Sequence, residues 1–342
     1  MQKIAIDEAY IKGAVSVEKN ASGLKPWRLP YRQLELFPAG ADDALVDKAE
    51  RPAGIRLRFI SNTQKLVLVV DKVITSDQDL CRFDLAIDNQ YQQTVELVDG
   101  ESQISFDALP AGEKTVDIWL PQFMPFTLCY LLIDDNALLT LPEKQQLAWV
   151  TYGSSITHCR TAHSPAKTWP AIIARKHNLD LTCLGYGGQC HLDPMLARII
   201  GDLPADLITL KLGINIYGGA SLSPRTFRSA IIGFIQIIRE KHPQTPIAVI
   251  SPIYSYEREH KDNAVWYTLQ KMRHDIADAV KRLITSGDPA LVYYNGLELF
   301  NQQMADKNMP DNLHPNGDGY ELLAEKISSV VIEPSLKKLI TK

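Results

Sequence analysis

The 342-residue sequence lacks the features of several specialised protein classes. It has no basic excess, because 40 aspartates and glutamates outnumber 36 lysines and arginines. Its overall charge therefore does not suit the neutralisation of nucleic-acid phosphates. It also has no apolar run near the roughly 18 residues that a membrane-spanning helix requires. We expect neither a nucleic acid nor a membrane as partner.

The sequence also lacks a pattern of paired cysteines. Its five cysteines are irregularly spaced, and an odd number cannot pair completely within one chain. No apolar segment of the length found in secretory signals follows Met1. Together these features indicate a cytoplasmic protein with reduced thiols. The histidines and cysteines of residues 158–191 have the spacing of no usual zinc site, so we expect no metal and no cofactor.

The first part of the sequence has the periodicity of β-strands. Over residues 55–140 apolar side chains recur mostly at every second position, as in residues 55–59, where three of them alternate with two arginines. Asp99-Gly100 is a typical hairpin turn between two such runs. We therefore expect an all-β, jelly-roll-like sandwich over residues 1–145.

From about residue 147 short apolar strands alternate with longer helical segments. The expected strands are residues 147–152, 179–184, 207–212, 247–251 and 291–294. Such alternation is typical of a parallel sheet with helices on both faces, in which ligands bind beyond the carboxyl ends of the strands. The polar stretch 141–146 marks the expected domain boundary, so the second domain would span residues 146–342.

The first of these strands ends in residues 152–157, YGSSIT. A serine behind a tight glycine turn at the head of a helix can be a nucleophile. A serine in this place is also an ordinary helix N-cap. The motif differs from the G-x-S-x-G elbow, because Thr157 stands where the second glycine belongs. The motif by itself leaves both interpretations open.

Two further motifs follow the second and third strands. Residues 184–190 (LGYGGQC) form a glycine-rich loop whose N–H groups can approach a phosphate or an oxyanion, but neither the dinucleotide fingerprint nor the P-loop matches. After the third strand, Asn215 can donate an amide hydrogen bond into a cleft. Both motifs are equally compatible with ordinary turns.

The fourth motif, residues 310–316 (PDNLHPN), precedes the last expected helix. A carboxylate three residues before a histidine can fold back onto its Nδ1 and leave Nε2 free to accept a proton. An Asx-type turn with an exposed histidine is the alternative. Together, however, the four motifs contain a nucleophile, a base with its orienting group and oxyanion donors, which are the parts that acyl transfer requires.

These four motifs, in this order, resemble the sequence blocks of the SGNH (GDSL) hydrolase family, over about residues 149–342. The resemblance implies a flavodoxin-like, three-layer α/β sandwich with a five-stranded parallel sheet. Ser154, Cys183 and Ile216 depart from residues usual in the family, but none of these replacements removes a group that performs chemistry. The Gly-Ser-Ser variant behind an N-terminal β domain resembles the two-domain branch that includes some carbohydrate esterases.

The resemblance also implies a role for each matching residue. Ser155 would be the nucleophile, His314 its general base and Asp311 the group that orients the imidazole. The oxyanion hole would consist of the N–H groups of Ser155 and Gly188 and the side-chain amide of Asn215.

We therefore expect a serine esterase that hydrolyses a short-chain ester, such as an acetyl ester, of a small molecule, with an acylated carbohydrate as one candidate. An acyltransferase with the same triad and an inactive, carbohydrate-binding relative are the alternatives. Tyr217, Tyr254, His158 and Arg160 are candidate substrate contacts, although packing or solvation explains each of them equally well. The oligomeric state and the acyl-chain length stay open.

Overall fold

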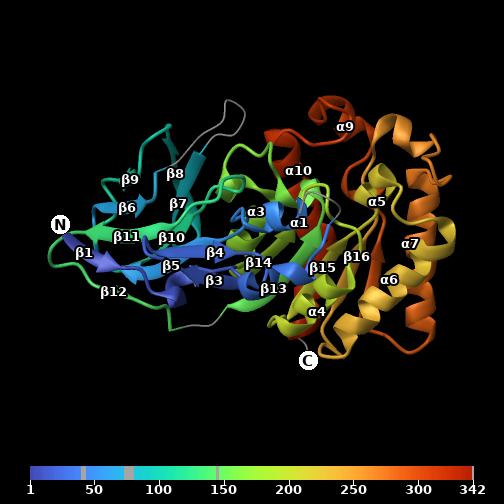
Figure 1. Cartoon of the computed structure of the whole chain (residues 1–342), viewed down its shortest axis with the longest axis horizontal. Coiled ribbons are helices and arrows are strands. Elements are labelled where there is room, and N and C mark those ends of the chain that lie inside the picture. The colour runs from blue at the N-terminus through green and yellow to red at the C-terminus, as the bar shows by residue number, and fades with distance from the viewer. Residues whose placement is uncertain (40–43, 73–80, 144–145, 341–342) are drawn as a thin grey trace. The chain divides into compact units, whose positions relative to one another are not determined.

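The computed structural model describes residues 1–39, 44–72, 81–143 and 146–340 (Figure 1). Contacts divide the chain into two units, Met1–Gln146 with Ser164–Cys183, and Leu147–His163 with Leu184–Lys342. Lys144 and Gln145, at the expected boundary, lie outside the described residues. The expected boundary between residues 145 and 146 therefore stays a prediction.

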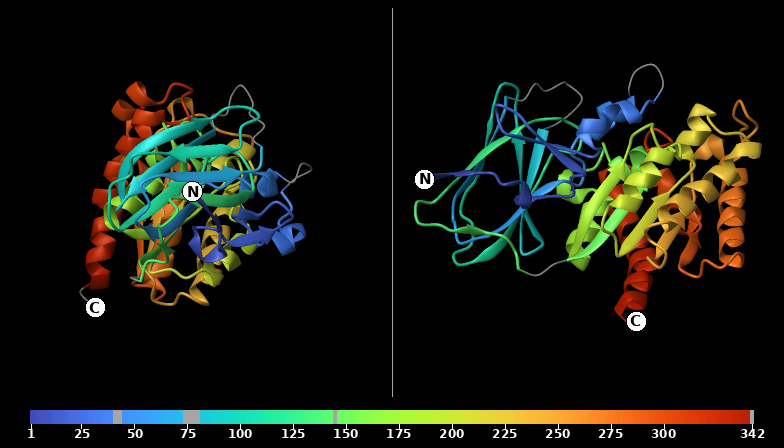
Figure 2. Two further views of the ribbon diagram at one scale, coloured as in Figure 1. Left: turned by 90° about the vertical axis from the view of Figure 1, so that its left-hand side faces the viewer. Right: turned by 60° about the horizontal axis from the view of Figure 1, so that its bottom comes forward.

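Two antiparallel sheets, each with six strands in the described residues, form the first unit (Figure 2). One has the order β3-β4-β11-β6-β9, with β1 also paired to β11, and the other has the order β12-β5-β10-β7-β8, with β2 also paired to β5. The strands of the first sheet are β1 (Gln2–Ala5), β3 (Ser16–Lys19), β4 (Leu24–Trp27), β6 (Leu66–Val70), β9 (Gln103–Phe106) and β11 (Leu128–Ile133). Those of the second are β2 (Ile11–Lys12), β5 (Arg56–Ser61), β7 (Cys81–Ile87), β8 (Gln90–Leu97), β10 (Lys114–Trp119) and β12 (Leu139–Thr140).

The apolar alternation in the sequence fills the core between these sheets. Leu57 and Phe59 are completely buried there, and the all-β prediction is confirmed. The alternating arginines of β5 are buried as well. Arg56 and Arg58 both form ion pairs with Asp117, whose side chain is also inaccessible to solvent. Charged side chains in this strand are thus paired inside the unit rather than hydrated.

The first unit also contains short helices and a segment from later in the chain. Its helices are η1 (Glu8–Tyr10), η2 (Tyr31–Leu36), α1 (Ala44–Ala49), η4 (Pro165–Lys167) and α3 (Trp169–His177). Polar contacts join the later segment to the β domain. Arg56 pairs with Asp180 at 2.9 Å, and the N–H of Ala166 donates to Asp84 Oδ2 at 2.6 Å.

The five-stranded sheet has the order β14-β13-β15-β16-β17, and the β13-β15, β15-β16 and β16-β17 pairs are parallel. This result confirms the expected α/β fold. Its strands are β13 (Leu147–Gly153), β14 (Leu179–Gly185), β15 (Leu207–Lys211), β16 (Ile247–Ile250) and β17 (Leu291–Tyr294). The helices of the second unit are α2 (Ser155–His158), α4 (Pro194–Asp202), α5 (Ile214–Gly219), α6 (Pro224–Arg239), η5 (Tyr256–Glu259), α7 (Leu269–Thr285), α8 (Gly296–Leu299), α9 (Gln302–Asn308), α10 (Gly317–Ile327), η6 (Ser328–Ile332) and α11 (Glu333–Ile340).

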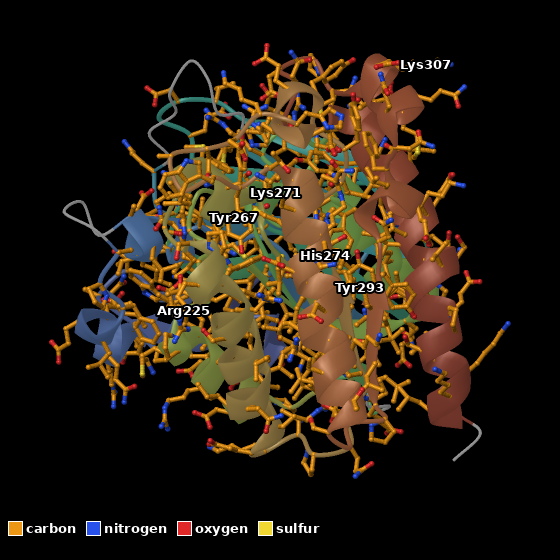
Figure 3. The ribbon with its side chains drawn as sticks, turned by 90° about the vertical axis from the view of Figure 1, so that its right-hand side faces the viewer. Arg225, Tyr267, Lys271, His274, Tyr293 and Lys307 are labelled. Atoms are coloured by element: carbon orange, nitrogen blue, oxygen red, sulfur yellow. The ribbon has the colours of Figure 1, made fainter. Side chains whose placement is uncertain are left out.

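Helices α6 and α7 pack side by side, and Figure 3 shows the side chains around them. Helix α6 buries a stripe that includes Phe227, Ile231 and Phe234, with the spacing of one helix face. A capping box of Ser223 and Thr226 fixes its first turn. Among the described residues, no helix has both the length and the apolar composition needed to cross a membrane.

Candidate active site

The two serines after β13 have different environments. Ser154 is the N-cap of α2, where its Oγ accepts the N–H of Ile156 at 3.3 Å. Ser155 Oγ instead lies 2.8 Å from His314 Nε2. The capping interpretation therefore describes Ser154, and the Ser155 hydroxyl is available for proton transfer.

Close packing around this turn requires glycine. A Cβ on Gly153 would lie 2.3 Å from Thr157 Oγ1, and a Cβ on Gly185 would lie 2.5 Å from the backbone nitrogen of His158. Any side chain at either position would displace α2. These glycines thus fix the position of Ser155 at the carboxyl end of β13.

A hydrogen-bonded chain joins Ser155, His314 and Asp311. Asp311 Oδ2 lies 2.6 Å from His314 Nδ1, and Asp311 Oδ1 accepts the backbone N–H groups of His314 at 2.6 Å and Leu313 at 2.9 Å. Burial alone raises the pKa of the Asp311 carboxyl, but these donors outweigh burial and hold the pKa below its ordinary value. The carboxylate is therefore ionised and can orient the imidazole, with Nε2 directed at Ser155.

Three N–H donors follow the carboxyl ends of β13, β14 and β15. Asn215 Oδ1 accepts the N–H of Cys190 at 3.1 Å, which assigns Nδ2 as the outward donor of the amide. In the described part of the chain, neither this Nδ2 nor the backbone N–H of Ser155 or Gly188 has a hydrogen-bond partner. These are the three groups expected to form the oxyanion hole.

Two histidines, His158 and His191, form hydrogen bonds with the glycine-rich loop. His158 is completely buried, and its Nδ1 accepts the N–H of Gly187 at 3.4 Å. His191 Nε2 lies 2.9 Å from the carbonyl oxygen of Gly188, whose positive φ of 77° favours glycine. His158 is therefore inaccessible to a substrate in this structure, and its ring stabilises the glycine-rich loop instead.

The other candidate substrate contacts differ in position. Tyr217 lines a cavity next to Asp311, and its hydroxyl donates to the carbonyl oxygen of Lys261 at 2.9 Å. Tyr254 is half-buried and packs edge-on against Tyr256, with ring centres 5.5 Å apart. Arg160 is exposed at the end of the turn after α2. Of the four candidates, Tyr217 is the one that lines this cavity, and it belongs to α5, the helix that also contains Asn215.

Sequence reasoning missed the residues that hold the Asp311 loop. The Oγ of Ser255 and the guanidinium of Arg258 both donate to the carbonyl oxygen of Asn312, at 2.7 and 3.1 Å. Asn312 itself has a left-handed backbone with φ of 58°. The position of Ser255 shortly after β16 was the available signal, but an isolated serine and arginine after a strand have no specific pattern.

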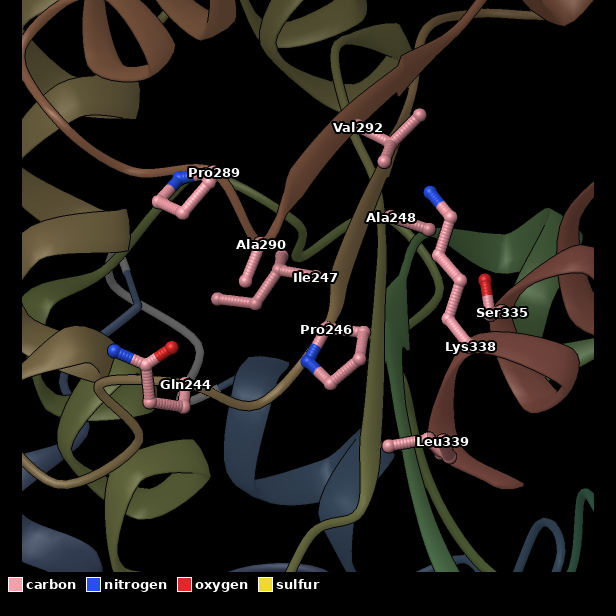
Figure 4. Close-up of a pocket in the computed structure, with 10 residues that line it drawn as sticks. All are labelled: Gln244, Pro246, Ile247, Ala248, Pro289, Ala290, Val292, Ser335, Lys338 and Leu339. Atoms are coloured by element: carbon pink, nitrogen blue, oxygen red, sulfur yellow. The ribbon is translucent and has the colours of Figure 1, made fainter. Parts of the chain in front are cut away.

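A separate apolar cavity of about 420 Å³ lies at the other end of the sheet (Figure 4). Its lining includes Ile247, at the first residue of β16, and Ala290, just before β17. The amino ends of parallel strands lie opposite the edge that carries Ser155, so this cavity is not part of the triad site. Within the described ranges, no three His, Cys, Asp or Glu side chains form a group that could hold a metal ion.

Comparisons with known proteins agree with this architecture. Residues 146–332 match the model of the GDSL-like lipase/acylhydrolase family, and residues 9–129 match the SsfX3 N-terminal domain. The solved structure described as a salicylyl-acyltransferase, SsfX3, from a tetracycline biosynthetic pathway is 31% identical, with 97% of each chain covered and a TM-score of 0.88. The search of curated proteins finds no match.

Two more distant structures share the fold. A putative GDSL-like lipase from Bacteroides ovatus is 20% identical, with 96% of this chain and 95% of that chain covered and a TM-score of 0.76. A family two carbohydrate esterase from Cellvibrio japonicus is 15% identical, with 98% of each chain covered and a TM-score of 0.64. At these identities the likeness extends to the fold alone.

Proposed function

Because the chain belongs to the GDSL-like lipase/acylhydrolase family, we propose that it is an acyltransferase that carries the acyl group on Ser155 and delivers it to an alcohol. The observation that carries this proposal is the chain of hydrogen bonds from Ser155 Oγ through the His314 ring to Asp311. The likeness to the salicylyl-acyltransferase supports transfer to an acceptor, since it covers both units.

In the first half-reaction His314 Nε2 takes the proton of Ser155 as Oγ attacks the ester carbonyl. Negative charge then develops on the carbonyl oxygen. The N–H groups of Ser155 and Gly188 and the Asn215 amide stabilise it, because they are donors already in place. His314 returns the proton to the leaving alcohol, and Asp311 stabilises the cationic imidazole in between.

In the second half-reaction an acceptor hydroxyl gives its proton to His314 and attacks the acyl-enzyme. The acceptor oxygen gains the acyl group, and Ser155 regains its proton through His314. Water can perform the same attack. Hydrolysis of a short-chain ester, such as an acetyl ester of a carbohydrate, is therefore the second candidate function, and the accessibility of His314, whose side chain is 29% exposed, favours it.

The test is the fate of the acyl group. Purified protein is given 4-nitrophenyl esters with acetyl, butyryl, octanoyl, benzoyl and salicyl groups, with and without a panel of alcohols and methyl glycosides. Nitrophenolate release gives acylation, and chromatography separates the free acid from the new ester. We expect new ester to exceed free acid with at least one acceptor, and Ser155→Ala to abolish both products.

If free acid were the sole product with every acceptor, hydrolysis would replace acyl transfer as the proposed function. Equal turnover by wild type and Ser155→Ala would contradict both functions. Absence of turnover of every ester, together with binding of glycosides, would point to an inactive carbohydrate-binding relative.

A further inference from the structure

A cavity of about 270 Å³ adjoins the triad on the side of Asp311. Its lining consists of Tyr217, Tyr256, Glu257, Arg258, Lys261, Asp311 and Asn312. All of these residues belong to the second unit, which also contains Ser155 and His314. The lining combines two aromatic rings, which are usual in ligand pockets, with two cations and two carboxylates.

Arg258 is the cation of this cavity that is fixed in place. It is half-buried, and its Nη1 donates to Ser255 Oγ at 3.3 Å and to the carbonyl oxygen of Asn312 at 3.1 Å. Its Nε and Nη2 have no hydrogen-bond partner among the described residues. Two neighbouring N–H donors of a held guanidinium match the two oxygens of a carboxylate.

The two tyrosines contribute rings rather than hydroxyls. The hydroxyl of Tyr256 donates to Asp306 Oδ1 at 2.6 Å, and that of Tyr217 donates to the carbonyl oxygen of Lys261. The bond to Asp306 raises the pKa of Tyr256, and burial raises that of Tyr217, so both phenols are neutral at neutral pH. Because both hydroxyls already have acceptors in the protein, the rings are the parts of these side chains that can contact a flat ligand.

The other charged side chains of the lining are Lys261, Glu257 and Asp311. Lys261 and Glu257 form an ion pair of 3.7 Å, but their side chains are 71% and 81% exposed, so water screens both of them. The carboxylate of Asp311 is bonded to His314 and Leu313. Arg258 is therefore the one of the two cations in the lining that the protein holds in place by hydrogen bonds.

The position of the cavity indicates which part of the reaction it serves. His314 is the group that exchanges protons with the alcohol in both half-reactions, and the cavity lies against the loop that holds His314. Asp311, which lines the cavity, bonds the Nδ1 of the same imidazole. None of Ser155, Gly188 and Asn215, the groups expected to meet the oxyanion of the acyl group, is part of the cavity lining.

We propose that this cavity is the acceptor subsite, and that it selects a flat, aromatic alcohol carrying a carboxylate, which Arg258 binds. The proposal rests on the proposed acyl transfer. In that step the bond between the acyl carbon and Ser155 Oγ breaks, a bond from the acyl carbon to the acceptor oxygen forms, and the acceptor proton passes through His314 to Ser155.

The test compares 4-(hydroxymethyl)benzoate with its neutral partner 4-(hydroxymethyl)benzamide, which has the same shape and the same hydroxyl. Calorimetry of the full chain with Ser155→Ala measures binding without turnover. We expect the carboxylate to bind about tenfold more tightly than the amide, and we expect Arg258→Gln to remove this preference. Arg258→Lys retains the charge without the bidentate geometry, so this variant should keep only part of the preference for the carboxylate over the amide.

Arg225→Gln and Lys307→Gln are matched controls, because both residues are exposed and neither lines the cavity. Neither should change the affinity for the carboxylate. Equal affinity of the carboxylate and the amide in the Ser155→Ala chain would overturn the subsite without any further variant, so the test does not depend on the folding of Arg258→Gln. A loss of affinity in the control variants equal to that in Arg258→Gln would overturn it as well.

A second assay separates this proposal from the proposed function. With 4-nitrophenyl acetate as donor, the wild type should form 4-(acetoxymethyl)benzoate faster than the corresponding amide. If the carboxylate bound in an Arg258-dependent manner but no ester formed, the subsite would be supported and acyl transfer would be refuted. Equal transfer to both alcohols would refute the subsite and leave acyl transfer standing.

Discussion

At Ser154 and Ser155 two adjacent hydroxyls have separate tasks, one as a helix cap and one as the partner of His314. We expect Ser155→Ala to lower kcat by roughly 10⁴ to 10⁶, since the whole covalent route is lost. Ser154→Ala is the matched control. It should cost about 1 kcal/mol of stability through the lost cap but lower kcat less than about tenfold. Ester turnover and urea unfolding of both variants measure these effects. Comparable losses of kcat in the two variants would contradict the assignment of Ser154 as a cap and Ser155 as the nucleophile.

Asn215 Oδ1 accepts the N–H of Cys190, and its Nδ2 is the proposed donor to the oxyanion. Asn215→Asp keeps the oxygen that accepts the Cys190 N–H and removes the outward donor. We expect kcat to fall by about 10² to 10³ with little change in KM, because the donor acts on the oxyanion rather than on the bound ester. Steady-state kinetics with a neutral aryl ester measures both constants. A kcat within about twofold of wild type would exclude the amide from the oxyanion hole.

Lys211 carries a buried charge at the end of β15. Burial lowers the pKa of its ammonium to about 8, with the thiols of Cys190 and Cys159 opposing and Arg273 reinforcing the shift. Between this pKa and that of the unfolded chain, near 10.4, the unfolded state binds more protons, so stability should rise with pH. Lys211→Met should therefore be more stable than wild type by about 2 to 3 kcal/mol at pH 7.

This advantage should shrink as pH rises from 8 to about 10, because the wild-type lysine then becomes neutral in the native state. Urea unfolding of both proteins at pH 7, 8, 9 and 10 measures it. A pH-independent difference between the two proteins would show that the ammonium is not the source of the effect.

At the scale of elements, Arg273 links α7 to the segment after β16. Its guanidinium bonds both oxygens of Glu259, at 2.6 Å each, and the carbonyl oxygens of Pro252 and Ile253. Glu259 in turn accepts the N–H of Ser255, the residue that holds the Asp311 loop. Helix packing and triad geometry are thus connected through one buried ion pair.

We expect Arg273→Met to destabilise the protein by roughly 3 to 5 kcal/mol, because Glu259 then remains buried and unpaired. The double variant R273M/E259M should be distinctly more stable than Arg273→Met alone, since no unpaired charge is left. Urea unfolding of the single and double variants measures the difference. Equal destabilisation would mean that packing of the arginine, rather than its pairing with Glu259, is what matters.

At the scale of the whole molecule, the two units are not consecutive stretches of sequence. Ser164–Cys183 is grouped with the β domain, where Arg56 bonds Asp180 and Asp84 bonds Ala166. A fragment of residues 146–342 lacks both partners. We expect it to be poorly soluble, or to unfold at a clearly lower urea concentration than the intact chain. A fragment with the stability and ester turnover of the full protein would contradict this and would support a boundary between residues 145 and 146.

The sequence alone determined the class of each unit and the order of the site motifs. Both depend on local patterns: a period of two for the paired sheets, alternation of strands and helices for the parallel sheet, and turns at strand ends. The carboxyl ends of parallel strands share one edge, so Ser155 and Asn215 were expected near each other before any coordinates. The resemblance to a family then identified His314 as their partner.

Only the tertiary structure decided contacts that no local pattern encodes. Ser155 and His314 are 159 residues apart, and their 2.8 Å approach depends on the packing of the helices and loops between them. Sequence spacing predicts none of three further features. These are the burial of His158, the hydrogen bond from Arg258 to the carbonyl oxygen of Asn312, and the grouping of residues 164–183 with the first unit. Periodicity specifies which face of an element is buried, whereas the partner that a polar side chain meets is set by long-range packing of the whole chain.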